Sequence, residues 1–500
     1  MSIMMGIWLS GILLAVGILL TFTRFERLKN IASELAAGVL LATLPFLVAF
    51  THQPLLVFAA ATHVWLILLP ARLIFGRLEP EFLLKSTWRN SILGALIAAF
   101  LCTLQIGQPE GYRPLVIITC LTLSIALGVY FFGQIWKNTR RYKITPSSKM
   151  PALRDLPTVS VCIPARNEDH ALTECLQSVI ASDYPKLEVI VLDDCSQDAT
   201  SDIVRSFAQD GVRFIQGDVP ATGWLGKNQA RQTLAEHATG QYIIFLDVDT
   251  HIGPYTVSHV VEYAMAQRLA MVSVLPQNRL TPGVATACAT LDYFWRLVLP
   301  ISPSQTPVSS SFWLISADKL RSLGSFASAS RKIMPEESFA VRLRQTNAYR
   351  FLVNDPSLAI TTAKRWSSQI ESAIRYNYPR ARRQPYVTFA ICTGLAVLGV
   401  APFLGLAACL ILGLTGPVMW LSLAASSLLL IDYFVVVRRV RPKSWFVDGW
   451  FLPLVLLQEI TAQVSSMLQY EFAEVTWKGR NVCYPVVAPK PDDRQPLRLL

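Results

Sequence analysis

Two carboxylates one residue apart follow a short hydrophobic run in the middle of the chain. Residues 242–246 read Tyr-Ile-Ile-Phe-Leu, which predicts a buried strand, and Asp247 and Asp249 come directly after them. Side chains at positions i and i+2 of an extended chain point to the same side, so the two carboxylates can converge on one divalent cation. Open α/β sheets bind ligands at the carboxyl ends of their strands. The pattern therefore predicts a metal site at a strand end.

A second pair of acids follows another predicted strand. The mostly apolar run 188–192 ends in Asp193 and Asp194, whose carboxylates could accept hydrogen bonds from a base and a ribose. The alternative is an ordinary loop in which Asp198 caps the next helix. Two strand ends that carry paired acids favour an enzyme over a purely structural domain.

Two further segments could contact a nucleotide. The strand predicted over residues 159–163 runs into Pro164-Ala165-Arg166-Asn167-Glu168, and a helix start after a strand can hold phosphate on its backbone N–H groups. Asn167 could instead be a plain helix cap. In Thr-Gly-Trp-Leu-Gly-Lys-Asn, residues 222–228, Trp224 offers a stacking face and Lys227 a charge for a diphosphate. The alternative for this segment is ordinary packing.

The elements around these residues indicate an α/β domain. Short β-rich runs alternate with helical stretches, which predicts a mostly parallel sheet with crossover helices. The predicted strands lie at residues 159–163, 189–192, 212–215, 242–246 and 269–274. We expect this domain to occupy residues 157–384, and a helix near residues 365–383, rich in Arg, Tyr and Trp, to lie on lipid headgroups.

Apolar runs close to the ~20 residues of a bilayer span flank the α/β domain. Within residues 1–143 we predict five spans, at 5–22, 32–50, 55–75, 92–106 and 115–136. Within residues 385–470 we predict two spans, at 387–404 and 418–437. Residues 446–468 are also apolar, but Asp448, Pro453 and Glu459 interrupt them, so we predict an interfacial or re-entrant segment. Residues 471–500 are expected to form a cytoplasmic tail.

The net charge of +11 does not indicate a nucleic-acid-binding surface. Residues 1–150 carry 13 Lys/Arg against 5 Asp/Glu, whereas residues 151–385 carry 23 against 22. The basic excess thus lies beside the spans, where it orients them and attracts anionic lipid headgroups. The loops after the first, third and fifth spans are the basic ones. We therefore expect an integral protein of a bacterial inner membrane with its N-terminus outside and its α/β domain in the cytoplasm.

The order of the motifs is more specific than any one of them. In chain order they are Pro164-Ala165-Arg166-Asn167-Glu168, Asp193-Asp194, Gly223-Trp224-Leu225-Gly226-Lys227 and Asp247-Val248-Asp249. This order resembles the family 2 glycosyltransferases, which have a GT-A fold, a Rossmann-like and mostly parallel α/β sheet. The forms of the first and third motifs look most like the subgroup near carotenoid- and hopanoid-associated glycosyltransferases.

Later segments continue the resemblance, which covers about residues 158–480. They are Leu323-Gly324-Ser325-Phe326, Met334-Pro335-Glu336-Glu337-Ser338, Lys364-Arg365-Trp366 and Trp477-Lys478-Gly479-Arg480. Three positions depart from the family pattern. Glu337 stands where the family has an aspartate base, Thr362 replaces the Gln of the QxxRW motif, and residues 309–311 are Ser-Ser-Ser where a glycine is usual.

The resemblance implies an inverting transfer from a UDP- or GDP-sugar. It assigns a Mg²⁺ or Mn²⁺ ion to Asp249 with help from Asp247, and proton transfer to Glu337 with Glu336 beside it. The nucleotide-sugar-binding residues that it implies are Pro164, Arg166, Glu168, Asp193, Asp194, Trp224, Lys227, Asp247, Arg365 and Trp366.

The adjoining spans indicate that the acceptor is a membrane lipid with a hydroxyl group, such as a carotenoid, a hopanoid or another isoprenoid or glycerolipid. Two alternatives remain open at this point. One is a processive polysaccharide synthase, against which the Thr362 replacement counts. The other is a transporter or membrane scaffold with a degenerate domain, against which the intact acids and the scarcity of charge within the spans count.

Overall fold

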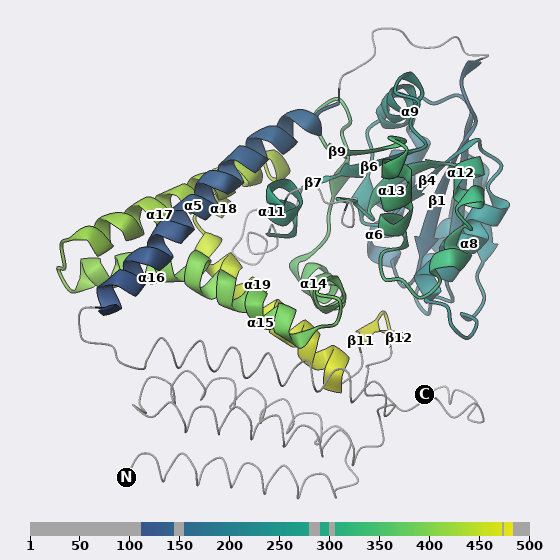
Figure 1. The fold of residues 1–500 in the computed structure, drawn as a ribbon. Helices are drawn as coiled ribbons and strands as arrows, with labels where there is room; N and C mark the ends of the chain where they lie inside the picture. Colours follow the sequence, from purple (N-terminus) through teal and green to yellow (C-terminus); the bar gives the residue numbers. More distant parts are fainter. Residues whose placement is uncertain (1–111, 145–154, 280–290, 300–305, 473–474, 484–500) are drawn as a thin grey trace, which may run out of the picture.

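The structure, a computed structural model, describes residues 112–144, 155–279, 291–299, 306–472 and 475–483. The first four predicted spans, at 5–22, 32–50, 55–75 and 92–106, lie outside the described residues, as does the end of the tail beyond residue 483. The described residues form an α/β domain joined to a group of long helices (Figure 1).

A seven-stranded sheet forms the centre of the α/β domain, with strand order β3-β2-β1-β4-β8-β6-β9. All neighbouring strands are parallel except β8, which runs antiparallel to β4 and β6. The strands are β1 (Val159–Ala165), β2 (Leu187–Asp193), β3 (Val212–Gln216), β4 (Tyr242–Leu246), β6 (Met271–Leu275), β8 (Phe312–Ser316) and β9 (Tyr349–Val353). The five predicted strands are all present, and the prediction of a mostly parallel sheet is confirmed.

Helices cover both faces of this sheet (Figure 1). The α/β domain contains α6 (Asp169–Ile180), α7 (Thr200–Ser206), η2 (Ala208–Asp210), α8 (Gly226–His237), α9 (Thr256–Ala266), α12 (Ala317–Ser322), η3 (Phe326–Ala329) and α13 (Pro335–Gln345). Alternate residues of the buried strands serve the two faces, because successive side chains of a strand point in opposite directions. In β4, Ile243 and Phe245 pack on the side of α8 and α13, and Ile244 and Leu246 pack on the side of α6 and α9.

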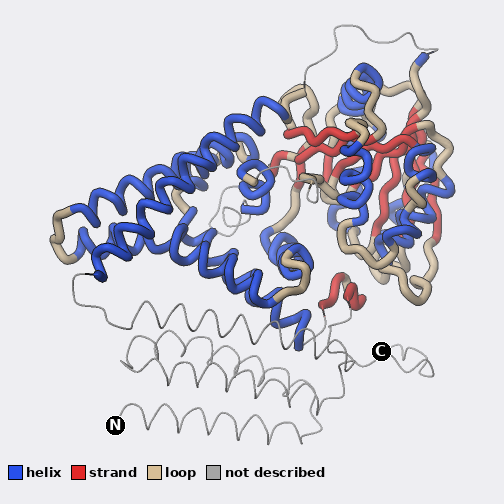
Figure 2. The backbone as a smooth tube through the Cα atoms, in the orientation of Figure 1, coloured by secondary structure: helices blue, strands red, loops and turns tan. Residues whose placement is uncertain are grey.

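Two small sheets bring distant segments together. In the first, of order β5-β10-β7, β10 (Thr361–Thr362) pairs with β5 (Thr250–His251) and β7 (Gln277–Asn278). This pairing places the segment after β10 beside the acids that follow β4. The second sheet is the hairpin of β11 (Val475–Trp477) and β12 (Arg480–Cys483). Figure 2 shows it apart from the main sheet, close to the ends of two long helices.

The remaining helices lie on one side of the α/β domain (Figure 2). They are α5 (Tyr112–Arg141), α11 (Leu291–Val298), α14 (Trp366–Arg380), α15 (Pro385–Gly394), η4 (Leu395–Val400), α16 (Ala401–Ile411), α17 (Pro417–Val440), α18 (Trp445–Gly449) and α19 (Leu452–Phe472). Three helical segments among the described residues, 117–141, 387–411 and 417–440, are long and apolar enough to cross a membrane. They coincide with predicted spans and indicate membrane association.

The core is continuous between the two halves. Phe131 and Ile135 of α5 and Tyr433 of α17 belong to the same buried apolar cluster as Phe245 of β4 and Phe339 of α13. The α/β domain is therefore packed onto the helices α5, α11 and α17 instead of being joined to them only through a linker. Its position relative to these apolar helices is fixed by that packing.

Candidate active site

The carboxyl end of β4 carries Asp247, which lies among positive charges. Its Oδ1 is 2.7 Å from Lys227 Nζ and 3.5 Å from Arg231 Nη2, both of α8. Burial alone would raise the pKa of Asp247, but the charges of Lys227 and Arg231 outweigh it and hold that pKa below its usual range. Asp247 is therefore a carboxylate that stays ionised, and its Oδ1 is already paired with Lys227 and Arg231 of α8.

Asp249 has a different environment. Burial, with a further contribution from the charge of Asp247, raises its pKa although Lys364 opposes the effect. Among the described residues Asp249 forms no salt bridge, and its carboxylate accepts a hydrogen bond from the Thr250 hydroxyl at 3.3 Å. Its backbone carbonyl accepts a hydrogen bond from Ala363 N at 2.9 Å. A half-buried carboxylate that forms no salt bridge among the described residues is suited to receive a cation.

The donor set fits a hard divalent ion that is shared with a substrate. No group of three or more His, Cys, Asp or Glu side chains in the described part of the chain is arranged to hold a metal. Mg²⁺ commonly takes only one or two carboxylates and fills its remaining positions with water and substrate phosphates. Asp249 with Asp247 could supply such a partial site, and the oxygen ligands also suit Mn²⁺.

Lys227 is held in place by the turn that begins α8. Gly223 has φ +90°, a conformation that L side chains rarely adopt. At Gly226 a Cβ would lie 2.6 Å from Nη1 of Arg480 and 3.0 Å from Oδ2 of Asp194. A larger side chain would thus be strained at Gly223 and too close to its neighbours at Gly226. Lys227 directly follows Gly226 at the N-terminus of α8. Trp224, between them, is half-buried and packs at the edge of the main core.

Arg231 connects the acids of β4 to those of α13. Its guanidinium lies 3.5 Å from Asp247 and 3.2 Å from Oε2 of Glu336, and it also donates to the carbonyl oxygen of Ser310 at 3.3 Å. Arg231 and Glu336 are almost completely buried, with side chains 2% and 1% exposed. The Glu336 carboxylate therefore faces Arg231 inside the protein, and its contribution is to hold the start of α13 beside Asp247.

Replacing Arg231 by methionine is expected to lower the free energy of unfolding by about 3 kcal/mol or more, because it leaves the Glu336 carboxylate buried without a partner. Thermal unfolding of the detergent-solubilised chain would measure the loss. The double variant R231M/E336Q, which removes both charges, is expected to recover most of the stability. A single R231M variant as stable as the wild type would contradict the assignment of this buried pair.

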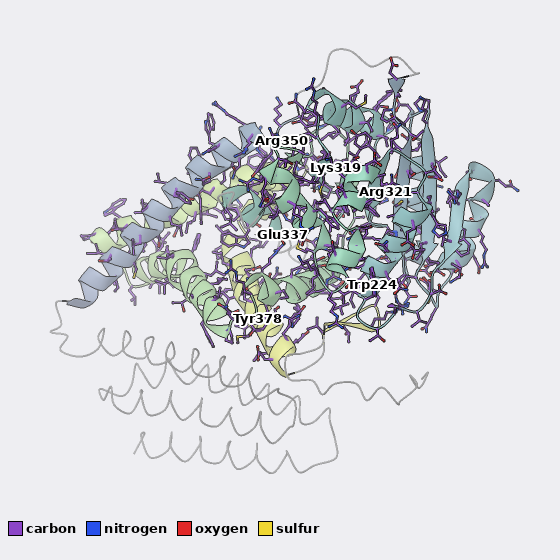
Figure 3. All side chains as sticks on the ribbon, turned by 45° about the vertical axis from the view of Figure 1, so that its right-hand side comes forward. Trp224, Lys319, Arg321, Glu337, Arg350 and Tyr378 are labelled. Atoms are coloured by element: carbon purple, nitrogen blue, oxygen red, sulfur yellow. The ribbon has the colours of Figure 1, made fainter. Side chains whose placement is uncertain are left out.

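Glu337 is the next residue, and it is half-buried on the first turn of α13. Burial raises its pKa above the usual value, Glu336 adds to the increase, and Arg380 opposes it. In the same helix, Phe339 packs edge-on to Phe326 with ring centroids 5.6 Å apart, and Phe326 packs on Phe245 with centroids 5.1 Å apart. These aromatic contacts anchor α13 on the sheet. Figure 3 shows Glu337 between the α/β domain and the apolar helices.

The other predicted nucleotide residues near β1 and β2 lie close together and bond to neighbouring protein groups. Asp193 accepts hydrogen bonds from Ser196 N at 3.0 Å and from the Ser201 hydroxyl. Arg166 Nη1 donates to the carbonyl oxygens of Asp194 at 2.5 Å and Cys195 at 2.9 Å. Pro164 lies in β1 opposite Leu192 of β2. The structure thus brings these predicted residues together at one edge of the sheet, where Asp193 and Arg166 already have protein partners.

The segment after β10 only partly meets the prediction. Lys364, which was not among the predicted site residues, acts electrostatically on both Asp247 and Asp249. Arg365 is the exposed N-cap of α14. Trp366 is 41% exposed, and its indole N–H donates to Gln458 Oε1 of α19 at 2.8 Å. The structure therefore brings Lys364 to the acids and directs the Trp366 N–H to α19.

Helix α14 contributes a further group of positive charge. Burial alone would raise the pKa of Tyr376, but the charges of Arg375, Lys227 and Lys364 outweigh burial and lower that pKa below its usual value. The Arg375 guanidinium donates to the Tyr376 hydroxyl at 2.8 Å and lies 5.2 Å from the ring centroid of Trp477. No periodic or motif signal in the sequence marks these contacts, because they depend on how α14 packs against the α/β domain.

Parts of the chain are similar to known proteins. Residues 160–284 match the family model described as Glycosyl transferase family 2. The chain is 30% identical over 158 residues to a 4,4'-diaponeurosporenoate glycosyltransferase of Staphylococcus haemolyticus, a match that covers 31% of this chain and 41% of the relative. It is 26% identical over 161 residues to a beta-monoglucosyldiacylglycerol synthase of Trichormus variabilis, covering 31% and 33%.

The chain thus spans less than half the length of these curated relatives. Among solved structures, it is similar to the mannosyltransferase PcManGT from Pyrobaculum calidifontis in complex with GDP-Man and Mn²⁺, with a TM-score of 0.42 and 20% sequence identity over 65% of this chain and 99% of that one. Residues 160–284 therefore match glycosyl transferase family 2, within a mixed, mostly parallel GT-A-like α/β domain that long apolar helices flank on both sides in the sequence.

Proposed function

We propose that the protein is an inverting glycosyltransferase that moves a sugar from a UDP- or GDP-sugar to a hydroxyl of a membrane lipid. One observation carries the proposal. Asp247 and Asp249 lie with Lys227 and Lys364 at one edge of the sheet, and Arg231 ties that edge to the turn that presents Glu337.

The donor diphosphate would lie at Asp249 and Asp247. A Mg²⁺ or Mn²⁺ ion held by these carboxylates would offset the negative charge that the leaving nucleoside diphosphate gains. Lys227 and Lys364 would add positive charge on the same side, where partial burial makes electrostatic attraction stronger than in water. Arg365 and Trp366, at the start of α14, would close over the diphosphate side as the donor binds.

The nucleoside would lie toward the ends of β1 and β2. Asp193 and Asp194 shape this part of the site together with Pro164, Arg166 and Glu168, and Trp224 offers a ring against which a base or sugar could stack. Because Asp193 and Arg166 already bond to other protein groups, we propose that their role is to hold the nucleoside-binding part of the site in shape.

Glu337 would accept the proton of the acceptor hydroxyl as its oxygen attacks the anomeric carbon. The attack comes from the face opposite the departing diphosphate, so the configuration at that carbon inverts. Burial raises the pKa of Glu337, which suits this role, because a carboxylate with a higher pKa is a stronger base. Glu336 would support Glu337 through its bond to Arg231.

The acceptor class is supported by position. Glu337 lies on the side of the α/β domain that faces the apolar helices (Figure 3), and these helices share a buried cluster with the sheet. A lipid held among them could present a hydroxyl to Glu337. The acceptors that we propose are carotenoids, hopanoids and glycerolipids, and two of the curated relatives have names that refer to a carotenoid-type acid and a diacylglycerol. Anionic headgroups would contact the basic residues of α14 and the span ends.

The proposal is tested by nucleotide release. The purified full chain, with Mn²⁺ and a bacterial lipid extract, is incubated with UDP-glucose, UDP-N-acetylglucosamine, UDP-galactose or GDP-mannose in turn. We expect at least one donor to release UDP or GDP at a rate that depends on both the lipid and the metal. Release from no donor would contradict the proposed reaction.

A further inference from the structure

The hairpin β11–β12 joins the donor site from the far end of the chain. Its two-residue turn is Lys478-Gly479, and both residues have positive φ, 48° and 76°. This is the conformation of a tight hairpin turn, which Asn-Gly usually occupies. A lysine rarely adopts the left-handed region because its Cβ crowds the backbone there, and the side chain of Lys478 makes specific contacts from that position.

Two ion pairs fasten the hairpin to the ends of β1 and β2. Arg480 Nη1 lies 2.6 Å from both carboxylate oxygens of Asp194. Lys478 Nζ lies 2.6 Å from Oε1 of Glu168 and donates to the carbonyl oxygen of Asn167 at 3.0 Å. In return, Arg166 Nε donates to the carbonyl oxygen of Lys478 at 3.2 Å. Two of the acids that the sequence assigns to the nucleotide are thus engaged by the hairpin.

The Arg480–Asp194 pair lies directly on the turn that carries Lys227. The position of a Cβ at Gly226 would be 2.6 Å from Arg480 Nη1 and 3.0 Å from Asp194 Oδ2. The pair therefore rests against the backbone at the start of α8, one residue before Lys227. Any movement of Arg480 would open space at this backbone and free the turn to shift.

The hairpin contacts the same turn from a second side. The ring centroid of Trp477 lies 5.9 Å from Lys227 Nζ and 5.2 Å from Arg375 Cζ. Leu225, in the turn itself, and Trp477 both pack against a small apolar cluster that includes Tyr378 of α14 and Tyr470 of α19.

We propose that the hairpin β11–β12 positions the donor-binding turn, with Arg480 and Trp477 as positioning residues that hold Lys227 against Asp247. This inference rests on the proposed function and deepens it. Arg480 acts through Asp194 and the start of α8 and needs no contact with the donor. Donor affinity therefore depends on an ion pair between residues 286 positions apart in the sequence.

Binding of UDP and of GDP to the full chain with Mn²⁺, measured by titration calorimetry, tests the inference. Variant R480Q is expected to bind the preferred nucleotide roughly tenfold more weakly, since a charge-assisted contact next to Lys227 is lost. D194N, whose amide fills the same space as the carboxylate, is expected to give the same loss of affinity. It replaces R480Q in the test if R480Q does not fold. R480K retains one cationic nitrogen and is expected to stay within about threefold of the wild type.

The double variant D194N/R480Q separates positioning from direct contact. If both residues act through one ion pair, the double variant is expected to bind no more weakly than the weaker single variant. R321Q is the matched control. It removes an exposed ion pair on α12, in which Arg321 lies 2.6 Å from Asp318, and is expected to bind the nucleotide as the wild type does. Additive losses, which would place Asp194 on the nucleoside itself, or wild-type affinity in R480Q would overturn the inference. A wild-type chain that binds neither nucleotide would instead contradict the proposed function.

Discussion

Replacing Asp249 by asparagine is expected to reduce sugar transfer about a thousandfold. Asp249 is the carboxylate at this edge that forms no salt bridge among the described residues, whereas Asp247 is bound by Lys227 and Arg231. An amide keeps the size of the side chain but removes the charge that would hold a divalent ion. Loss of one well-placed electrostatic contact to a developing anion commonly costs a factor of 100 to 1,000, or about 3–4 kcal/mol.

Transfer of radiolabelled sugar into extractable lipid measures this loss. Variant D318N provides the control, because Asp318 lies exposed on α12 and pairs only with Arg321 in the described structure. EDTA is expected to inhibit the wild type and Mn²⁺ to restore it, while neither changes the residual activity of D249N. A D249N variant that transfers sugar at more than a tenth of the wild-type rate would exclude Asp249 as the metal ligand.

Replacing Glu337 by glutamine is expected to reduce the turnover rate by a factor of 100 to 10,000, the usual range for a lost general base. The amide cannot accept the acceptor proton. E337D, which restores the aspartate that the family resemblance implies at this position, is expected to keep part of the activity. The binding of UDP and GDP with Mn²⁺ should be unchanged in E337Q, because Glu337 acts on the acceptor.

The pH profile gives an independent check of the same role. A base works only when deprotonated, and burial raises the pKa of Glu337 above that of an ordinary glutamate. The wild-type rate should therefore fall as the pH is lowered through that raised pKa, at a higher pH than for an exposed glutamate. E337Q should lack this acidic limb. An acidic limb of the same position and steepness in E337Q would assign the base to another residue.

Much of the fold could be predicted from the sequence because its strands are buried on both faces. Runs such as Tyr242–Leu246 are continuously apolar and end abruptly in acids, so both the strand and its carboxyl end are marked. The parallel order of β1, β2 and β4 then brings Asp193 and Asp247 to one edge without any further assumption. Motif order supplied the rest of the expected arrangement.

The ion pairs that hold the site together could not be predicted in the same way. Arg231 and Glu336 are 105 residues apart, and Arg480 and Asp194 are 286 apart. Which of the chain's many basic side chains meets a given acid depends on how the helices pack, and no local pattern marks the partner. Helix α14 illustrates this: its composition predicts a surface helix, and it packs on α19 through Asn377 and Tyr378.

Lipid mass spectrometry of cells that express the wild-type chain or D249N tests glycosyl transfer to a lipid most directly. We expect a lipid that is heavier by one sugar residue in cells with the wild type and absent from cells with D249N. A ladder of products with many sugar residues would favour a processive synthase. Identical lipid profiles in the two strains, with D249N folded and present in the membrane, would contradict the proposed reaction.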